Sequence, residues 1–275
     1  MVERYNVQIL NVGLEFLIKS MKIEKIFESI NISNGDKVLV SSSILKFLIK
    51  YKKENKIFDA NLIIDLLISK IGKEGTLLFP TFNWDFCKGR DFDYYKTQSS
   101  SGSLGNFALQ RSEFQRTKNP IYSFAVTGKD KDYICGLQHE SCFGLDSPFG
   151  YLIKNRGKNL FIDIDYKEGF TFDHIAEEAV GVDYRYFKNF EGFYINKLNK
   201  KEKVCYKMYV RDLSLGVEMT AIDKKFDKIL INNNAYKKKI IDGINFILID
   251  IGKAYELAVK DLNSKRGLIY PKKNK

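Results

Sequence analysis

Hydrophobic positions in the first third of the chain switch between helical and strand spacing. Apolar residues recur at helical spacing from Leu14 to Ile30, and KVLVSS over Lys37–Ser42 predicts a short buried strand. A helical stretch then runs through Tyr51, a second helix begins at Asp59 and ends near Ile71, and TLLFP predicts another strand. This order of elements favours a mainly parallel sheet flanked by helices.

The middle of the chain has a different pattern. The segment from Thr81 to Arg116 contains aromatics, serines and glycines without sustained periodicity, and such long loops in compact domains are usually functional. Strands are predicted over Ser123–Gly128 and Lys158–Asp165. Helices are predicted over Ser147–Lys154 and Phe170–Val180.

The last third predicts further strands. Residues 184–194 and 203–210 alternate like antiparallel strands of a hairpin, and a strand near Phe246–Asp250 precedes a helix from Lys253 to about Asn263. We therefore expect an α/β fold with a mixed, largely parallel central sheet flanked by helices and an antiparallel β extension in the C-terminal half. No linker marks a boundary, so residues 1–275 are expected to form a single domain.

Length and composition indicate the size of the core and the cellular location to expect. It has 275 residues, 44% of them hydrophobic, which is enough for one large core. Its apolar runs are shorter than the roughly 20 residues of a membrane helix, so no membrane insertion is expected. The start MVERYNVQIL has no basic region before an apolar stretch, and a cytoplasmic location is expected.

The net charge of +11 favours anionic partners such as nucleic acid, anionic membranes or phosphorylated small molecules. Part of the excess is local, in Lys237–Lys239 and in a tail with Lys272, Lys273 and Lys275, and such runs are often only solvated faces. No nucleic-acid-binding motif is present, which leaves a basic nucleic-acid-binding protein as a remote alternative.

The cysteines Cys87, Cys135, Cys142 and Cys205 form no CxxC pair. Cys135, His139 and Cys142 lack a fourth nearby ligand for zinc. Reduced, packed thiols and no metal are therefore expected.

Histidine is the side chain best suited to move protons near neutral pH, and the chain has two. His174 lies in FTFDHIAEE after a strand, where Thr171 is a plausible helix N-cap and Glu177 falls three residues on, within reach of one imidazole nitrogen. The pattern is typical of a general base with a supporting carboxylate, and also of a structural histidine. His139 lies in a loop.

The serines at the end of the first predicted strand form a second candidate site. Ser41, Ser42 and Ser43 lead into a helix, where backbone N–H groups and hydroxyls suit an anion. Neither GxGxxG nor GxxxxGKS is present, and a plain cap is the structural alternative.

Five segments resemble, in order, the aminoglycoside 3-N-acetyltransferases from about Gly35 to Tyr186: GDKVLVSSSIL, EGTLLFPTFNWDF, KNPIYSFAVTG, FGLDSPFGYLIK and FTFDHIAEE. The resemblance implies an acetyl-CoA-dependent N-acetyltransferase with His174 as base, Glu177 as its support and Thr171 beside the thioester. It further places five residues close to coenzyme A: Ser41, Ser42, Ser43, Thr81 and Ser123.

The chemistry agrees with these residues. A neutral imidazole can deprotonate an ammonium, and Thr171, Asn83 or backbone N–H groups could stabilise the oxyanion. No cysteine has a histidine partner in the sequence, so direct attack is expected rather than an acyl-enzyme.

The acceptor is predicted from two departures and the charge. Asn119 and Ser41 stand where relatives have histidine, and an overall charge of +11 favours an anionic acceptor. A dTDP- or UDP-linked amino sugar for surface polysaccharide synthesis is therefore the first hypothesis, and an aminoglycoside, with antibiotic resistance, is the alternative. The loop aromatics either stack on a base or form core: Phe82, Trp84, Phe86, Phe92, Tyr94 and Tyr95. The sequence leaves the choice between monomer and homodimer open.

Overall fold

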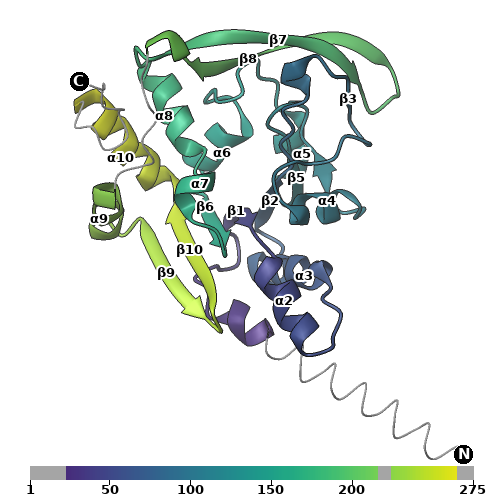
Figure 1. Cartoon of the computed structure of the whole chain (residues 1–275), viewed down its shortest axis with the longest axis vertical. Helices are drawn as coiled ribbons and strands as arrows, with labels where there is room; N and C mark the ends of the chain where they lie inside the picture. The colour runs from purple at the N-terminus through teal and green to yellow at the C-terminus, as the bar shows by residue number, and fades with distance from the viewer. Residues whose placement is uncertain (1–22, 216–223, 265–275) are drawn as a thin grey trace, which may run out of the picture.

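The central sheet has three parallel strands in its middle and antiparallel strands on both sides (Figure 1). The computed structural model describes residues 23–215 and 224–264. Its strands pair in the order β4 (Gln115–Arg116), β5 (Phe124–Gly128), β2 (Thr76–Pro80), β1 (Lys37–Ser42), β6 (Lys158–Ile162), β10 (Ile244–Asp250) and β9 (Tyr236–Ile241). β1 pairs in parallel with β2 and β6, and the other pairings are antiparallel. The predicted mixed sheet is confirmed, with parallel pairing confined to its centre.

Both faces of the central strands are buried, which explains their uninterrupted apolar runs. Val38 and Val40 of β1 pack in one core with α2 (Leu45–Lys53), α3 (Ala60–Ile71) and α4 (Ser103–Leu109). Leu39 belongs to a second core, on the other face. Six α-helices of the described residues contribute to that second core: α5 (Lys131–Gly136), α6 (Pro148–Lys154), α7 (Tyr166–Gly169), α8 (Phe172–Val180), α9 (Lys224–Asn232) and α10 (Ile251–Ser264).

The predicted helix boundaries follow from local capping. The Asp59 carboxylate accepts a hydrogen bond from the Asn61 N–H at 2.9 Å at the start of α3, and Gly72, with φ +61°, ends that helix. The Ser147 hydroxyl accepts from the Gly150 N–H at the start of α6. These caps satisfy N–H groups that the first helical turn leaves unpaired.

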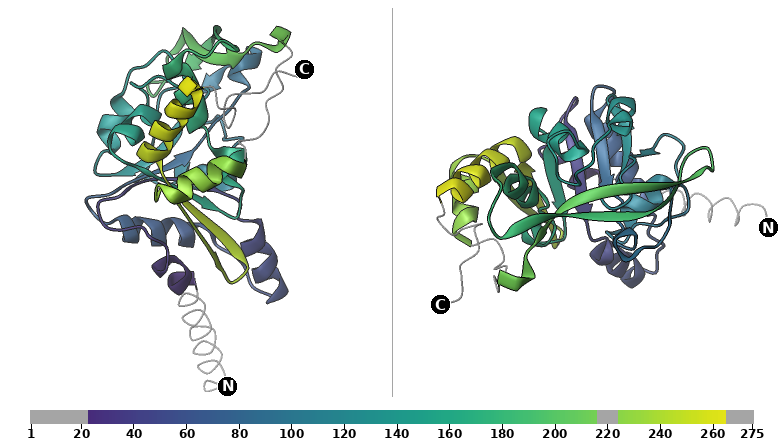
Figure 2. Two further views of the ribbon diagram at one scale, coloured as in Figure 1. Left: turned by 90° about the vertical axis from the view of Figure 1, so that its left-hand side faces the viewer. Right: turned by 90° about the horizontal axis from the view of Figure 1, so that it is seen from above.

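A long β-hairpin crosses the top of the molecule, as the view from above in Figure 2 shows. It consists of β7 (Arg185–Ile195) and β8 (Lys201–Arg211), and the short β3 (Phe92–Asp93) pairs with β7 to complete a second sheet. The predicted antiparallel extension is confirmed. Main-chain bonds fasten β8 to the loop before α6: the Cys142 N–H donates to the Lys207 carbonyl at 2.9 Å, and the Lys207 N–H donates to the Glu140 carbonyl at 3.0 Å.

Several short elements were not predicted: η1 (Phe86–Lys88), α4, α5, α7 (Tyr166–Gly169), η2 (Leu213–Leu215), α9, β4 and β9. β9 is an edge strand that carries exposed lysines, so it has no apolar periodicity to signal it. β6 ends at Ile162 rather than Asp165, because Asp163 adopts φ +53° and the Asp165 carboxylate caps α7.

Parts of some predictions lie outside the described residues. Of the helix predicted over Leu14–Ile30, residues 23–28 are helical and the earlier ones fall outside. The lysines of the C-terminal tail, at 272, 273 and 275, also fall outside. The single-domain organisation stays a prediction.

Candidate active site

The loops that follow β1, β2 and β6 surround a pocket of about 410 Å³ at the carboxyl edge of the parallel strands. Its lining comprises Ser41, Ser42, Pro80, Phe82, Trp84, Ser101, Gly102, Tyr122, Ile164, Gly169, Thr171 and His174. The start of α4 reaches this edge because Gly105 has no side chain. A Cβ there would lie 2.3 Å from the Pro80 carbonyl oxygen.

His174 lies in the first turn of α8 and is held by Glu177. Its Nδ1 is 2.9 Å from Oε2 of Glu177, as the three-residue spacing on a helix predicts. The Glu177 side chain is fully buried, whereas 28% of the His174 side chain is exposed. With Nδ1 engaged inside the protein, Nε2 is the nitrogen left for a molecule in the pocket. The contact is present, and the catalytic roles of the two residues stay a prediction.

The charges around His174 favour a protonatable imidazole beside an ionised carboxylate. Burial would lower the pKa of His174, but Asp173, with Oδ1 at 3.3 Å from Nδ1, and Glu177 outweigh burial and raise that pKa above its usual value. Burial would raise the pKa of Glu177, yet its hydrogen bond to His174 and the charge of Arg185 hold it below its ordinary range. Glu177 is therefore an acceptor for the Nδ1 proton.

Two residues that the sequence analysis missed complete the surroundings of Glu177. The Tyr184 hydroxyl donates to Oε1 at 2.7 Å, and Nε of Arg185 lies 2.8 Å from Oε2. They reach the carboxylate because Gly181, with φ +69°, ends α8 and turns the chain back along it. In the sequence these residues appear as a Tyr-Arg pair just beyond the end of a predicted helix. Spacing alone does not show which side chain such a pair contacts.

The serine-rich strand end contributes two of its three predicted residues. Ser41 and Ser42 line the pocket. Ser43 does not: its N–H donates to the Ile162 carbonyl at 2.9 Å and its hydroxyl accepts from the Leu45 N–H. Thr171 also lines the pocket. It stands at the N-cap position of α8, but its side chain does not cap the helix, contrary to the prediction.

Thr81 and Ser123 do not line the pocket. Both are fully buried, and their hydroxyls lie 2.8 Å apart. The buried Arg116 explains their place: its Nε donates to the Ser123 hydroxyl at 3.0 Å and its Nη2 donates to the Thr81 carbonyl at 3.1 Å. The two residues therefore anchor the loop after β2 from beneath, and direct contact with coenzyme A does not follow from their positions.

Neither Asn83 nor Asn119 faces the pocket. The Asn83 amide donates to the Gln98 carbonyl at 2.9 Å, and its side-chain oxygen accepts from the Asp85 N–H. The side-chain oxygen of Asn119 accepts from the N–H groups of Ile121 and Tyr122, both at 2.9 Å. One hydrogen of the Asn83 amide is used by the Gln98 carbonyl, and the role of Asn83 toward an oxyanion stays a prediction. Asn119 shapes the turn before Tyr122, which lines the pocket.

The loop aromatics divide between pocket and core. Phe82 and Trp84 line the pocket with Tyr122; Nε1 of Trp84 donates to the Tyr122 hydroxyl at 3.4 Å. Phe86, Phe92 and Tyr94 are buried, and Tyr95 is exposed. Of the two hypotheses for these side chains, core packing holds for the buried three, and a stacking surface remains open for Phe82 and Trp84.

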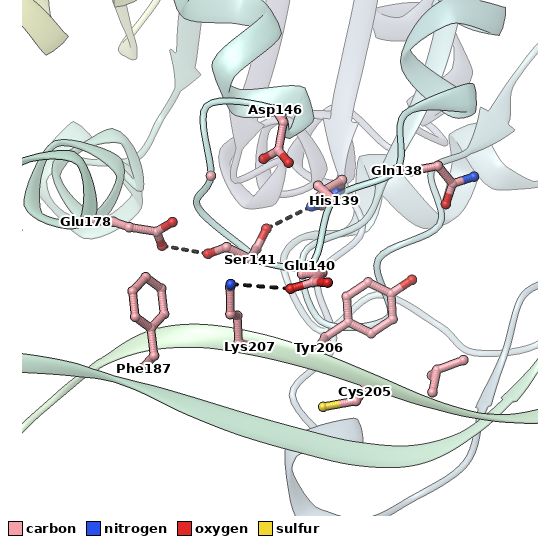
Figure 3. Close-up of a pocket in the computed structure, with 12 residues that line it drawn as sticks. Gln138, His139, Glu140, Ser141, Asp146, Glu178, Phe187, Cys205, Tyr206 and Lys207 are labelled. Atoms are coloured by element: carbon pink, nitrogen blue, oxygen red, sulfur yellow. Dashed lines mark hydrogen bonds and ion pairs between the residues drawn. The ribbon is translucent and has the colours of Figure 1, made fainter.

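A second cavity, of about 760 Å³, lies between the hairpin and the loop that carries His139 (Figure 3). Its lining includes Glu140, Asp146 and Glu178, with Lys207 as the one lysine or arginine among the lining residues. Glu178 follows one turn after His174 on α8 and accepts a hydrogen bond from the Ser141 hydroxyl at 2.6 Å. Lys207 pairs with Glu140 at 3.3 Å. Carboxylates thus outnumber cations in the lining.

The remaining candidate residues have structural surroundings. Nδ1 of His139 lies 2.8 Å from the Ser141 carbonyl oxygen, and burial lowers the pKa of His139. Cys135 and Cys142 are buried free thiols. Within residues 23–215 and 224–264, no three or more histidine, cysteine or acidic side chains gather as a metal site would require. None of the described helices is long and apolar enough to cross a membrane.

A sequence model of the family described as "Aminoglycoside 3-N-acetyltransferase" matches residues 52–263, more than half of the chain. The chain belongs to the aminoglycoside 3-N-acetyltransferase family. This membership confirms the predicted family and the predicted class of enzyme, an N-acetyltransferase with acetyl-CoA as its cosubstrate. No curated protein matches the chain.

Solved structures share the fold of this chain. The binary complex of AAC-IIIb with CoASH superposes with a TM-score of 0.72 at 15% identity, over 90% of this chain and 96% of that one. Sisomicin-bound AAC-VIa superposes with a TM-score of 0.71 at 15% identity, over 90% of this chain and 98% of that one. The YokD protein from Bacillus subtilis superposes with a TM-score of 0.69 at 20% identity, over 90% of this chain and 95% of that one. At these identities the likeness shows the fold alone.

Proposed function

We propose that this family member acetylates an amino group of a polycationic amino sugar of the aminoglycoside type, with acetyl-CoA as donor and His174 as general base. The observation that carries the proposal is the position of His174. Glu177 holds its Nδ1 inside the protein, and the ring lines a pocket between the serine end of β1 and Thr171.

The reaction removes two protons from the acceptor nitrogen. Nε2 of His174 first takes the ammonium proton and releases it to solvent, and the neutral amine nitrogen then attacks the thioester carbonyl carbon. Thr171 lines the pocket and its side chain does not cap α8, so its hydroxyl is the proposed donor to the oxyanion. Nε2 takes the second proton from the same nitrogen as the N–C bond forms, and passes it to the coenzyme A sulfur when the C–S bond breaks. Glu177 stabilises the imidazolium between these steps.

Ser41 and Ser42 support the donor side of this proposal. They line the pocket at the carboxyl end of β1. Short hydroxyls there leave room for a thioester arm and offer hydrogen bonds to it. AAC-IIIb, which shares the fold, was solved with CoASH.

The distribution of charge favours a cationic acceptor over the predicted nucleotide-linked sugar. Three carboxylates and one lysine line the cavity one helical turn from His174. The lysines of residues 237–239 lie on β9, at the opposite end of the molecule from the hairpin (Figure 1). The overall charge of +11 therefore does not describe the site, and AAC-VIa, of the same fold, was solved with sisomicin. A nucleotide-linked acceptor keeps the support of the net charge and of the open stacking surface at Phe82 and Trp84.

A comparison of acceptors tests the proposal. The purified full chain is given acetyl-CoA with sisomicin, kanamycin, or a UDP- or dTDP-linked amino sugar, and release of the free thiol is followed. We expect the specificity constant for an aminoglycoside to exceed that for either nucleotide sugar. Turnover of a nucleotide sugar without turnover of any aminoglycoside would restore the first hypothesis. His174→Asn serves as the blank for enzyme-dependent release.

A further inference from the structure

Arg185 touches both members of the His174–Glu177 pair. It is the first residue of β7, and 8% of its side chain is exposed. Its Nε lies 2.8 Å from Oε2 of Glu177, its Nη2 lies 3.1 Å from Nδ1 of His174, and its Nη1 donates to the Tyr209 carbonyl at 3.0 Å. The bond to β8 holds the guanidinium in place, so the hairpin fixes a cation at the base of the site.

A cation at this position offsets the negative charge around the imidazole of His174. Nδ1 faces two carboxyl groups, Asp173 at 3.3 Å and Glu177 at 2.9 Å, and negative charge on either favours the protonated imidazole, although burial raises the pKa of Asp173. An imidazolium cannot accept a proton from the acceptor amine. The nearby phenols of Tyr184 and, across the pocket, Tyr122 stay neutral because burial raises the pKa of each. Arg185 is the positive side chain in contact with the pair among the described residues.

Arg185 also decides which nitrogen carries the proton. Nδ1 has one position for a hydrogen, so it either donates to Glu177 or accepts from Nη2 of Arg185. Because the ion pair with Nε favours a charged Glu177, the carboxylate accepts the Nδ1 proton, and the 3.1 Å approach of Nη2 to Nδ1 is then a contact of charge and not a hydrogen bond. Nε2 is then free to act as the base.

We propose that Arg185 is a positioning residue for acetyl transfer: it fixes the Glu177 carboxylate on Nδ1 and supplies a counter-charge that opposes protonation of the imidazole of His174. The inference rests on the proposed role of His174 as base. The hairpin thus contributes to the active site through its first residue, Arg185, whose positive charge offsets the negative charge of the carboxyl groups on α8.

The test compares Arg185→Met and Arg185→Lys with Arg211→Met. Arg211 pairs with Arg185 across the hairpin, so its loss removes the same charge nearby without the contact. The chain has only two histidines, so the Cε1–H resonances of the free protein give separate titrations, assigned with His139→Asn. We expect Arg185→Met to raise the His174 midpoint by about one pH unit or more, and Arg185→Lys by less, because lysine keeps the charge. Arg211→Met should leave the midpoint in place.

Turnover supplies the second readout. The acidic limb of kcat should move to higher pH in Arg185→Met by the same amount as the titration midpoint. An unmoved midpoint in Arg185→Met, or an equal shift in Arg211→Met, would refute the contact role. If Arg185→Met does not fold, Arg185→Gln, which is also neutral, is titrated in its place, and an unmoved midpoint in that variant refutes the role equally. The titration needs no substrate, so a chain that acetylates none of the acceptors would overturn the proposed function without deciding the role of Arg185.

Discussion

The Tyr184 hydroxyl donates to Oε1 of Glu177 at 2.7 Å and leaves Oε2 for His174. Oε2 is shared by His174 and by Nε of Arg185, so both oxygens of the buried carboxylate have partners. Removal of the hydroxyl in Tyr184→Phe leaves Oε1 without this donor. We expect a loss of about 1–3 kcal/mol in unfolding free energy, measured by urea denaturation, with a smaller effect from Tyr186→Phe, whose ring is 48% exposed. Equal stability of the two variants would show that the bond contributes nothing.

His174→Asn should bind acetyl-CoA and fold normally but lose about 10²–10⁴-fold in kcat, the usual contribution of a general base. His139→Asn is the matched control, because His139 lies in the loop beside the second cavity with Nδ1 engaged by a carbonyl. It should change kcat little. Near-normal turnover in His174→Asn would remove His174 from the mechanism, and collapse of its fold would favour a structural histidine.

The pH dependence follows from the raised pKa of His174. The base must be neutral, so kcat should fall as pH drops through this pKa, which lies above the usual value of about 6.5. Glu177→Gln removes a carboxylate that raises this pKa, so the acidic limb should move to lower pH while the maximal kcat falls. A pH profile from 5 to 9 measures both effects. An acidic limb that stays in place in Glu177→Gln would contradict the contact seen at 2.9 Å.

Acetyl-CoA should stabilise the chain against heat, because binding to the folded state alone adds about 2.7 kcal/mol at a hundredfold excess over Kd. Ser42→Leu should reduce the shift in Tm by crowding the pocket, whereas Ser43→Leu should not, because Ser43 does not line it. Thermal scans with and without millimolar acetyl-CoA give the comparison. Identical shifts in both variants would place the donor elsewhere.

The acidic cavity predicts how acceptors are chosen. Asp146→Asn should lower the specificity constant for a polycationic acceptor by about threefold to tenfold and weaken its dependence on salt. Glu256→Gln, an exposed position on α10 outside both cavities, makes the same change in charge and should have no effect. Asp146→Asn should leave the specificity constant for a monoamine acceptor unchanged. Losses of equal size in the two variants would point to overall charge rather than to the cavity.

The local part of the site followed from the sequence. The spacing of His174 and Glu177 predicted their contact, because three residues on a helix bring side chains to one face. The strand and hairpin periods predicted β1, β2, β7 and β8 for the same reason: regular backbone repeats turn a linear pattern into a face. The parallel pairing of β1 and β6 brings the ends of both strands to one edge of the sheet. Ser41, Ser42 and His174 line the same pocket at that edge.

Tertiary structure decided what spacing cannot express. Thr81 and Ser123 belong to the same resemblance as Ser42, yet they are buried on Arg116, because depth below a surface depends on neighbours distant in sequence. Arg185 meets Glu177 only because the chain turns at Gly181. The net charge of +11 does not show that three carboxylates and one lysine line the cavity beside α8, since a sum over residues carries no positions. Local repeats are encoded in order along the chain, whereas the surroundings of each charge exist only after the strands, helices and hairpin have packed.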